Sequence, residues 1–282
     1  MNQDISICVL TENEMGWTEP FELDKVQILD NYYLSAQKSD IAFLKKMDTA
    51  RLLAGFRTTA GIDTKGVRPY GGWEDSLLGG HCVGHYLTAL AQAVKVTGDK
   101  ELKEKSQTLI AGLEECQKKL GTGFLFGAKV EDKEDVEKQF DILEGKKKGE
   151  TWVPWYNMHK VLAGLVDTYK YTGNETALLV AEKLGDWIYE RVSKWDLKTN
   201  QKVLETEYGG MNDCLYELYS YSHNKHHLEA AQKFDEKALF LMAAKGEKNC
   251  LDGKHANTQI PKFIGAIKRY NVLKQLGEAK QE

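Results

Sequence analysis

Proline is scarce in this chain, with only 4 among 282 residues, and the alternation of apolar and polar residues that marks a half-buried strand is almost absent. Apolar residues instead recur at i, i+3, i+4 and i+7, the spacing of one face of a helix. A hydrophobic fraction of 42% supplies enough apolar surface for a sizeable core. The sequence therefore predicts an all-α protein and leaves little room for a sheet or for extensive disorder.

Closely spaced cysteines and long apolar runs are also missing from this sequence. Its 5 cysteines are far apart and form no C-x-x-C pair, which excludes a zinc knuckle or a redox motif of that kind and suits a reducing compartment. The start MNQDISICVL does not read as a secretory signal, and no run is long enough to span a membrane. We expect a cytoplasmic protein with no membrane partner, or a secreted or periplasmic one if a leader has been removed.

Neither sign of charge dominates. With 38 Lys and Arg against 42 Asp and Glu, the net charge of -4 gives no reason to expect a nucleic acid partner. The chain has 6 Trp and 13 Tyr. Because such side chains combine a flat apolar face with a polar edge, they suit sugars, although they are also common in cores. A neutral carbohydrate is therefore the expected partner.

A unit of one helix, a short polar turn and a second helix recurs along the sequence. In each turn Gly or Asn can end the first helix in a left-handed conformation, and Asp99 or Asn174 can cap the second. In the first two copies one helix is mostly apolar and its partner carries Lys and Glu, as expected for inner and outer helices of a ring. The turns lie at residues 97–99, 172–174 and 222–224, and a fourth copy begins near residue 260.

Long aromatic connections between the copies favour a closed ring over a solenoid, whose links are usually short. We therefore predict an all-α fold, an (α/α)6-barrel or toroid, as a single domain over residues 1–282 with a ligand site at its mouth. A full toroid needs about six hairpins, and roughly four can be counted, so we expect a ring truncated at its C-terminus. The charged residues 131–150 are expected to form a solvated flap.

The Gly-rich residues 71–87 carry Trp73 and Glu74 into an apolar helix headed by two histidines, His81 and His85, which share a helix face. His85, His159 and His255 stand at equivalent places, at the starts of three apolar segments. If the hairpins surround an axis, these imidazoles converge at one end of it and can bind sugar hydroxyls. Each taken alone is more often a structural histidine.

Two further patterns surround the expected pocket. Trp155, Tyr156 and neighbouring residues can form its apolar wall, or else staple the following helix. Acidic residues and an amide precede the third apolar helix, and Asn212 is a candidate sugar ligand. The His-x-x-x-His spacing resembles a zinc motif, but Cys82 stands where the Glu of H-E-x-x-H would be, so we predict no metal in this chain.

A glycosidase that uses two carboxylates needs one protonated acid and a second carboxylate across the bond. Acidic residues at helix starts are often structural instead, because they cap free N–H groups and favour the helix dipole. We expect about half of the candidates to be structural. The in-chain candidates are Glu74, Glu207 and Asp213, with Asp75 and Glu205 as further loop carboxylates.

Long segments of the chain resemble glycoside hydrolase family 127 and its relatives such as family 146, in order from about Asp30 to Tyr270. The resemblance implies an (α/α)6-barrel that acts on β-L-arabinofuranosides of plant-type glycans, with sugar-contacting histidines at His85, His159 and His255. The segments are GGWE with GHxxGHYLTALA, WVPWYNMHKVLAGLVDTYKYTGN, ETEYGGMND and HANTQIPKFIGAIKRY.

The mechanism that the resemblance implies is retaining. A zinc-bound cysteine thiolate is the nucleophile, zinc is held by one Glu and three Cys, and a second Glu is the acid/base. That segment follows the fourth repeat in the family, and none of the five cysteines here matches it. We therefore expect the catalytic residues beyond residue 282, no cofactor in this chain, zinc in the full-length family member, and a second copy or a complementary chain covering the open ring.

Two alternatives stay open at this point. The chain can be another α/α-toroid sugar enzyme, such as an inverting hydrolase or an epimerase, that uses Glu, Asp and His residues present here as acid and base. It can also be a carbohydrate-binding scaffold with no catalytic activity.

Overall fold

The structure, a computed structural model, describes residues 20–130, 132–247 and 250–277. Residues 1–10, on which the expected location of the protein rests, lie outside these ranges, as does Cys8. The described residues form α-helices and two short 3₁₀-helices, and no strand. The elements are η1 Leu23–Lys25, α1 Asn31–Lys46, α2 Thr49–Thr59, η2 Gly72–Asp75, α3 His81–Thr97, α4 Lys100–Leu120, α5 Lys138–Glu144, α6 Pro154–Thr172, α7 Glu175–Val192, α8 Leu197–Leu204, α9 Met211–Ser222, α10 Lys225–Lys233, α11 Lys237–Ala244 and α12 Ala256–Gln275.

The predicted turns join α3 to α4, α6 to α7 and α9 to α10. Gly98 and Gly173 take the left-handed conformation that ends a helix, with φ of 66° and 67°. In the third turn it is His223 that adopts this conformation. The next residue then caps the following helix, as Asn174 does by accepting a hydrogen bond from Ala177 N at 3.1 Å.

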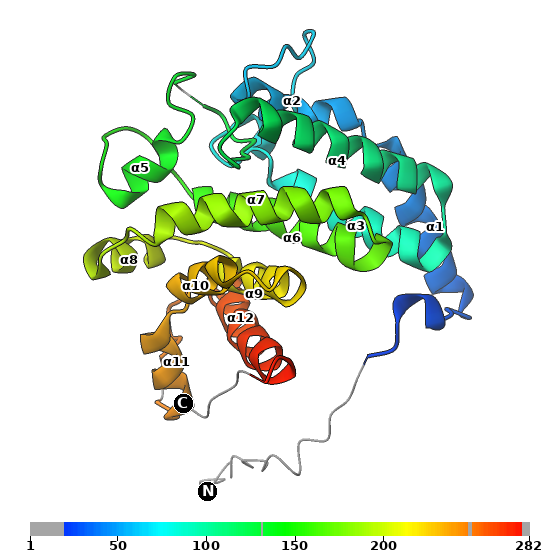
Figure 1. The fold of residues 1–282 in the computed structure, drawn as a ribbon. Coiled ribbons are helices and arrows are strands. Elements are labelled where there is room, and N and C mark those ends of the chain that lie inside the picture. The colour runs from blue at the N-terminus through cyan, green and yellow to red at the C-terminus, as the bar shows by residue number, and fades with distance from the viewer. Residues whose placement is uncertain (1–19, 131, 248–249, 278–282) are drawn as a thin grey trace, which may run out of the picture.

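The hairpins are arranged as an α/α toroid, as predicted. Inner helix α3 packs against α6, α6 against α9, and α9 against α12, while outer helix α4 packs against α7 and α7 against α10. Figure 1 shows these hairpins following one another from α3 and α4 down to α12. Helices α5, α8 and α11 belong to the connections between hairpins and lie on the left of that view. The polar turns and the long connections are thus at opposite ends of the hairpins.

Glycine allows the first two inner helices to touch backbone to backbone. A Cβ added at Gly84 of α3 would lie 1.8 Å from the carbonyl oxygen of Lys160 in α6, and one added at Gly164 would lie 2.4 Å from the carbonyl oxygen of Gly84. Real Cβ atoms essentially never come within 3.0 Å of another heavy atom. Only glycine fits at this crossing. The crossing therefore fixes which residues of α3 lie opposite which residues of α6.

Between the inner and outer helices lies one continuous apolar core. Its centre is aromatic: Trp155, at 0% exposure, meets Phe140 edge to face at 4.9 Å between ring centroids and Phe234 at 5.1 Å. Such edge-to-face pairs add to the free energy of burial. Trp155 therefore belongs to the packing of α6 against its neighbours and does not form the wall of an open pocket.

The prediction of a solvated flap at residues 131–150 is wrong for its central part. These residues contain α5, whose Phe140 is buried in the aromatic core. Arg191 of α7 binds three carboxylates of this segment, with its nitrogens at 3.0, 2.5 and 2.5 Å from their oxygens. The sequence shows only that this segment is highly charged. It does not show that three of its acids bind the same arginine. They are Glu137, Asp141 and Glu144.

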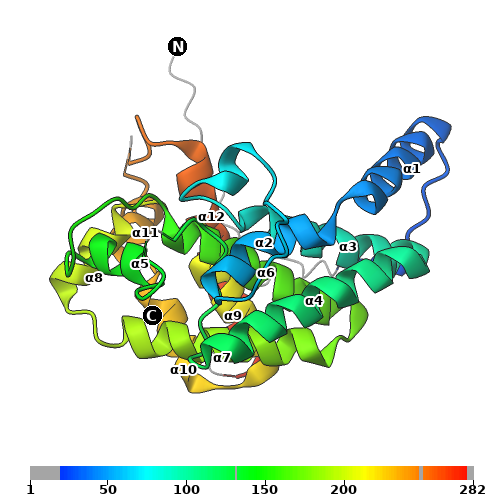
Figure 2. The same cartoon turned by 90° about the horizontal axis from the view of Figure 1, so that it is seen from above.

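The two ends of the described chain expose apolar side chains. Helix α1 has no buried residue and projects from the other helices in Figure 2. Helix α12 packs on α9, but Ile260, Ile264 and Ile267 on another face are 57%, 49% and 62% exposed. Among the described helices, none is both long and apolar enough to cross a membrane.

Candidate functional site

Four inner helices lie close together where they begin. The side-chain amide of Asn157, in the first turn of α6, donates to the carbonyl oxygen of Gly79, two residues before α3, at 2.5 Å. Gly210 N, at the start of α9, donates to Nδ1 of His159 at 3.0 Å. Asn257, at the start of α12, lies close enough to the Tyr156 hydroxyl to oppose the rise of its pKa. Residues at the starts of α3, α6, α9 and α12 therefore lie at one end of the toroid.

Glu74 of η2 acts as the cap that α3 lacks, because the residue before that helix is Gly80, which has no side chain. Its carboxylate oxygens accept hydrogen bonds from Gly80 N at 2.9 Å and Cys82 N at 3.2 Å. Burial would raise the pKa of Glu74, but hydrogen bonds from His81, Gly80 and Cys82 outweigh it and hold the pKa below its ordinary value. Glu74 is therefore ionised, and both of its oxygens accept hydrogen bonds, so it is poorly suited to act as a protonated general acid.

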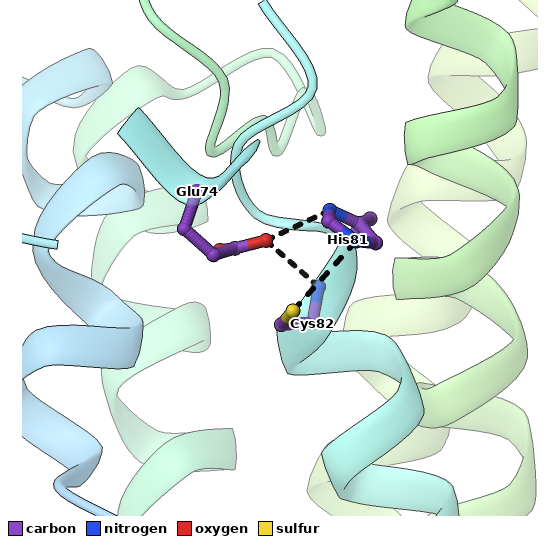
Figure 3. Close-up of side chains that lie close together, drawn as sticks. All are labelled: Glu74, His81 and Cys82. Carbon is purple, nitrogen blue, oxygen red and sulfur yellow. Dashed lines mark hydrogen bonds and ion pairs between the residues drawn. The ribbon is translucent and has the colours of Figure 1, made fainter. Parts of the chain in front are cut away.

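His81, Glu74 and Cys82 form a triangle in which each residue contacts the other two (Figure 3). Its Nδ1 is 2.8 Å from a Glu74 carboxylate oxygen and 2.8 Å from the carbonyl oxygen of Leu78, and its Nε2 is 3.7 Å from Cys82 Sγ. Burial would lower the pKa of His81, but hydrogen bonds with Cys82 and Glu74 raise it to about 10. The residue predicted as a companion of His85 is thus a buried imidazolium held by its neighbours.

His85 lies one helical turn further along α3 and is exposed. Its ring is nearly perpendicular to that of His81, with centroids 6.3 Å apart. Partial desolvation lowers the pKa of His85, and the charges of Lys160 and His81 lower it further. At neutral pH His85 is therefore an uncharged ring that offers one donor and one acceptor to a ligand.

His159 of α6 lies beneath the glycine pair that precedes α9. A Cβ on Gly209 would lie 2.4 Å from its Nδ1, so the loop passes over the ring only because it lacks side chains. Burial holds the pKa of His159 well below its ordinary value, and the charges of Lys160 and His85 add to this. Because Nδ1 accepts from Gly210 N, the neutral ring carries its proton on Nε2.

Polar and aromatic side chains surround these two histidines. Lys160 Nζ lies 4.7 Å from the centre of the Tyr156 ring, a cation–π contact. Burial raises the pKa of the half-buried Tyr156, and the nearby charge of Glu207 raises it further. A carboxylate oxygen of Glu207 is buried with no hydrogen-bond partner among the described residues. Trp73 is 66% exposed, and its ring centroid is 6.3 Å from that of His81.

The structure therefore brings together Trp73, Glu74, His85, Tyr156 and His159, with Glu207 beside them. Lys160 and Asn257 also belong to this group, and sequence reasoning missed both. The spacing of Lys160 four residues after Tyr156 could have indicated the first, because residues at i and i+4 share a helix face. Asn257 could not be found without knowing where α12 begins.

Other predicted ligands lie elsewhere. Asn212 is fully buried, and its amide donates to an Asp235 carboxylate oxygen and to the carbonyl oxygen of Lys262, both at 3.3 Å. His255 is the residue before α12, where its side chain makes no capping hydrogen bond; it is exposed, and no described contact joins it to His85 or His159. The structure thus places His85 near His159 and, in the part of the chain that it describes, shows no contact of His255 with either ring.

Asp213, a candidate acid, lies in the first turn of α9. Burial raises its pKa against the opposing charge of Lys268. Asp167 of α6 also has its pKa raised by burial and accepts a hydrogen bond from Thr88 at 2.7 Å. Glu217 between them is paired with Lys268 and with a second lysine. Asp75 and Glu205 are exposed, and Glu205 ends α8.

The model of the family described as Beta-L-arabinofuranosidase, GH127 catalytic domain, matches residues 25–281. The chain belongs to this family. Among solved structures it is similar to Ara127N, described as a GH127 β-L-arabinofuranosidase from Geobacillus stearothermophilus T6, with 15% identity and a TM-score of 0.55. The likeness covers 90% of this chain and 42% of that one, so this chain spans less than half its length. No curated protein matches the chain.

The zinc site that the family implies does not fit the residues described here. The only group of metal-ligand atoms that comes together in the described ranges is that of Glu74, His81 and Cys82, within 4.8 Å of one another, and it contains a single cysteine. The family site is expected to hold zinc through one Glu and three Cys, whereas this group supplies one Glu, one His and one Cys.

Proposed function

We propose that this chain of the GH127 family binds the arabinofuranose ring of a β-L-arabinofuranoside at the shared beginning of α3 and α6. The observation that supports this proposal is the pair of neutral imidazoles of His85 and His159. They lie on two helices that touch at glycine. Neutral rings can donate to and accept from sugar hydroxyls, whereas imidazolium ions can only donate. Tyr156 and Glu207 supply a further hydroxyl and carboxylate, and the exposed Trp73 offers an apolar face to the ring.

We also propose a substrate and a reaction for this site. By resemblance, the substrate is a terminal arabinofuranoside of a plant-type glycan, and its hydrolysis is retaining. This reaction requires a catalytic glutamate and a zinc-bound thiolate, and the group of Glu74, His81 and Cys82 differs from the expected zinc ligands of one Glu and three Cys. We therefore propose that these residues recognise the sugar and leave the chemical step to groups outside them, so that this chain alone binds without turnover.

Calorimetric titration with methyl β-L-arabinofuranoside tests the recognition. We expect His85→Ala to weaken binding about fivefold, since losing a hydrogen bond costs about 1 kcal/mol and 1.4 kcal/mol is a factor of ten. The matched control is His226→Ala on outer helix α10, where the ring stacks on Tyr189 with centroids 4.0 Å apart. Equal affinity of wild type and His85→Ala, or equal weakening by the control, would contradict the proposal.

A second candidate rests on the buried acids of the inner helices. Burial raises the pKa of Asp213, and its Oδ1 has no hydrogen-bond partner among the described residues, as expected for a general acid in a toroid enzyme that uses its own carboxyls. Sugar release by the purified chain, abolished in Asp213→Asn while binding persists, would favour this hydrolase. Binding without release favours recognition alone.

A further inference from the structure

Cys82 differs from the other described cysteines in its surroundings. Its sulfur lies 3.7 Å from His81 Nε2, and it is partly exposed, whereas Cys116 and Cys214 are buried. Burial raises the pKa of the Cys116 thiol to about 12 and that of Cys214 well above its ordinary value, so both are inert thiols. Cys250 is partly exposed, and no hydrogen bond joins it to a histidine in the ranges that the structure describes.

The hydrogen bonds around His81 determine which ring nitrogen points toward the sulfur of Cys82. Nδ1 lies 2.8 Å from the carbonyl oxygen of Leu78 and 2.8 Å from a carboxylate oxygen of Glu74. Both partners are acceptors, because the carbonyl has no proton and Glu74 is ionised, so Nδ1 must be a donor. Because the pKa of His81 is raised to about 10, Nε2 also holds a proton at neutral pH, and it faces Cys82 Sγ as a charged donor that can stabilise a thiolate.

The thiol is held in place from the other side as well. Cys82 N donates to a Glu74 carboxylate oxygen at 3.2 Å, so the acid that orients His81 also fixes the backbone of the cysteine. Cys82 is the second residue of α3, where the positive end of the helix dipole favours a negative sulfur. A nucleophile, a charged donor beside it and an acid that orients the donor are the three parts of an activated thiol.

We propose that Cys82 is a nucleophilic thiol, activated by His81 and Glu74, and that it is a site of covalent modification by small disulfides. The thiolate sulfur of Cys82, stabilised by the proton on His81 Nε2, attacks one sulfur of the disulfide. The new bond joins Cys82 Sγ to that sulfur while the original disulfide bond breaks and its other half leaves as a thiolate. Cys82 is oxidised and the leaving half is reduced, so the step needs no other reactant.

The test is exposure of the whole chain, dialysed against a chelator, to oxidised glutathione at neutral pH, with each cysteine followed by peptide mass spectrometry. Cys250 in the same molecules is the internal reference. We expect Cys82 to form the mixed disulfide about tenfold faster, because an ordinary thiol with a pKa of about 8.5 is only about 3% thiolate at neutral pH. Equal rates at the two cysteines would overturn the proposal.

Two variants separate activation from simple access. His81→Gln keeps a side chain that can hydrogen-bond Glu74 but cannot carry a positive charge, so the excess reactivity of Cys82 should vanish; its persistence in a variant with native circular dichroism would refute the role of His81. If His81→Gln does not fold, the ultraviolet absorbance of a thiolate decides, since it should be present in wild type and absent in Cys82→Ser. Equal absorbance would refute the proposal, as would labelling of Cys82 that is blocked by added zinc at a 1:1 ratio.

Discussion

The contact between α3 and α6 leads to a prediction for Gly84→Ala. The added Cβ would lie 1.8 Å from the carbonyl oxygen of Lys160, and this obstacle is the backbone of a packed helix, which cannot rotate away. Overpacking a core costs about 1–3 kcal/mol, and more where the neighbours cannot move. Alanine returns up to about 1 kcal/mol through its better helix propensity. We expect a net loss of about 2 kcal/mol, with a melting temperature about 4–8 °C lower.

Gly112→Ala is the matched comparison, because Gly112 also lies within a helix and gains the same propensity. Its Cβ would meet a methyl carbon of Leu53 at 2.4 Å, the end of a side chain that can turn aside. Thermal unfolding followed by circular dichroism should therefore rank the two variants, with Gly84→Ala the less stable. A Gly84→Ala protein that melts at or above the wild-type temperature, or one more stable than Gly112→Ala, would refute this account of the helix crossing.

Three further predictions concern pH, the α5 segment and association. The folded-state pKa of His81 is raised from 6.5 to about 10, so its contribution to stability is complete below about pH 6.5 and is lost as pH rises toward 10. The melting temperature should therefore fall less across this pH range in His81→Gln than in the wild type. Arg191→Ala leaves three carboxylates without their shared cation, so we expect a loss of about 3–5 kcal/mol and rapid proteolysis between residues 121 and 153, whereas an unchanged cleavage pattern would contradict the anchor. Sedimentation should find the chain associated through the exposed face of α12, and Ile264→Lys should shift it toward monomer; a wild-type monomer would count against that expectation.

The turns and the division into inner and outer helices could be predicted from the sequence because both depend on local chemistry. Gly98 and Gly173 end helices for reasons that involve only their own backbone, and Asn174 caps a helix that begins at the next residue. Apolar periodicity likewise reports which face of a helix is buried. Each of these features is settled within a few residues, so a single sequence is enough.

Roles that depend on distant partners could not be predicted in this way. Trp155 reads as a pocket wall, but whether it faces a cavity or the core depends on Phe140 and Phe234, far away in sequence. Residues 131–150 look like a solvated flap because their charge is visible, while Arg191, which binds them, lies on another helix. Glu74 is an acid near histidines in the sequence, and only the fold shows that it caps α3.

The positions of the two neutral histidines follow from the glycine crossing and from nothing local to either residue. His85 is the residue after Gly84, and His159 is the residue before Lys160, whose carbonyl oxygen stands where a Cβ on Gly84 would be. The contact that sets the distance between the helices therefore also sets the distance between the imidazoles. A substitution that separates α3 from α6 should weaken sugar binding even if every side chain of the site is kept. Gly84→Ala should accordingly lose affinity for the arabinofuranoside at temperatures where it is fully folded, and Gly112→Ala should not.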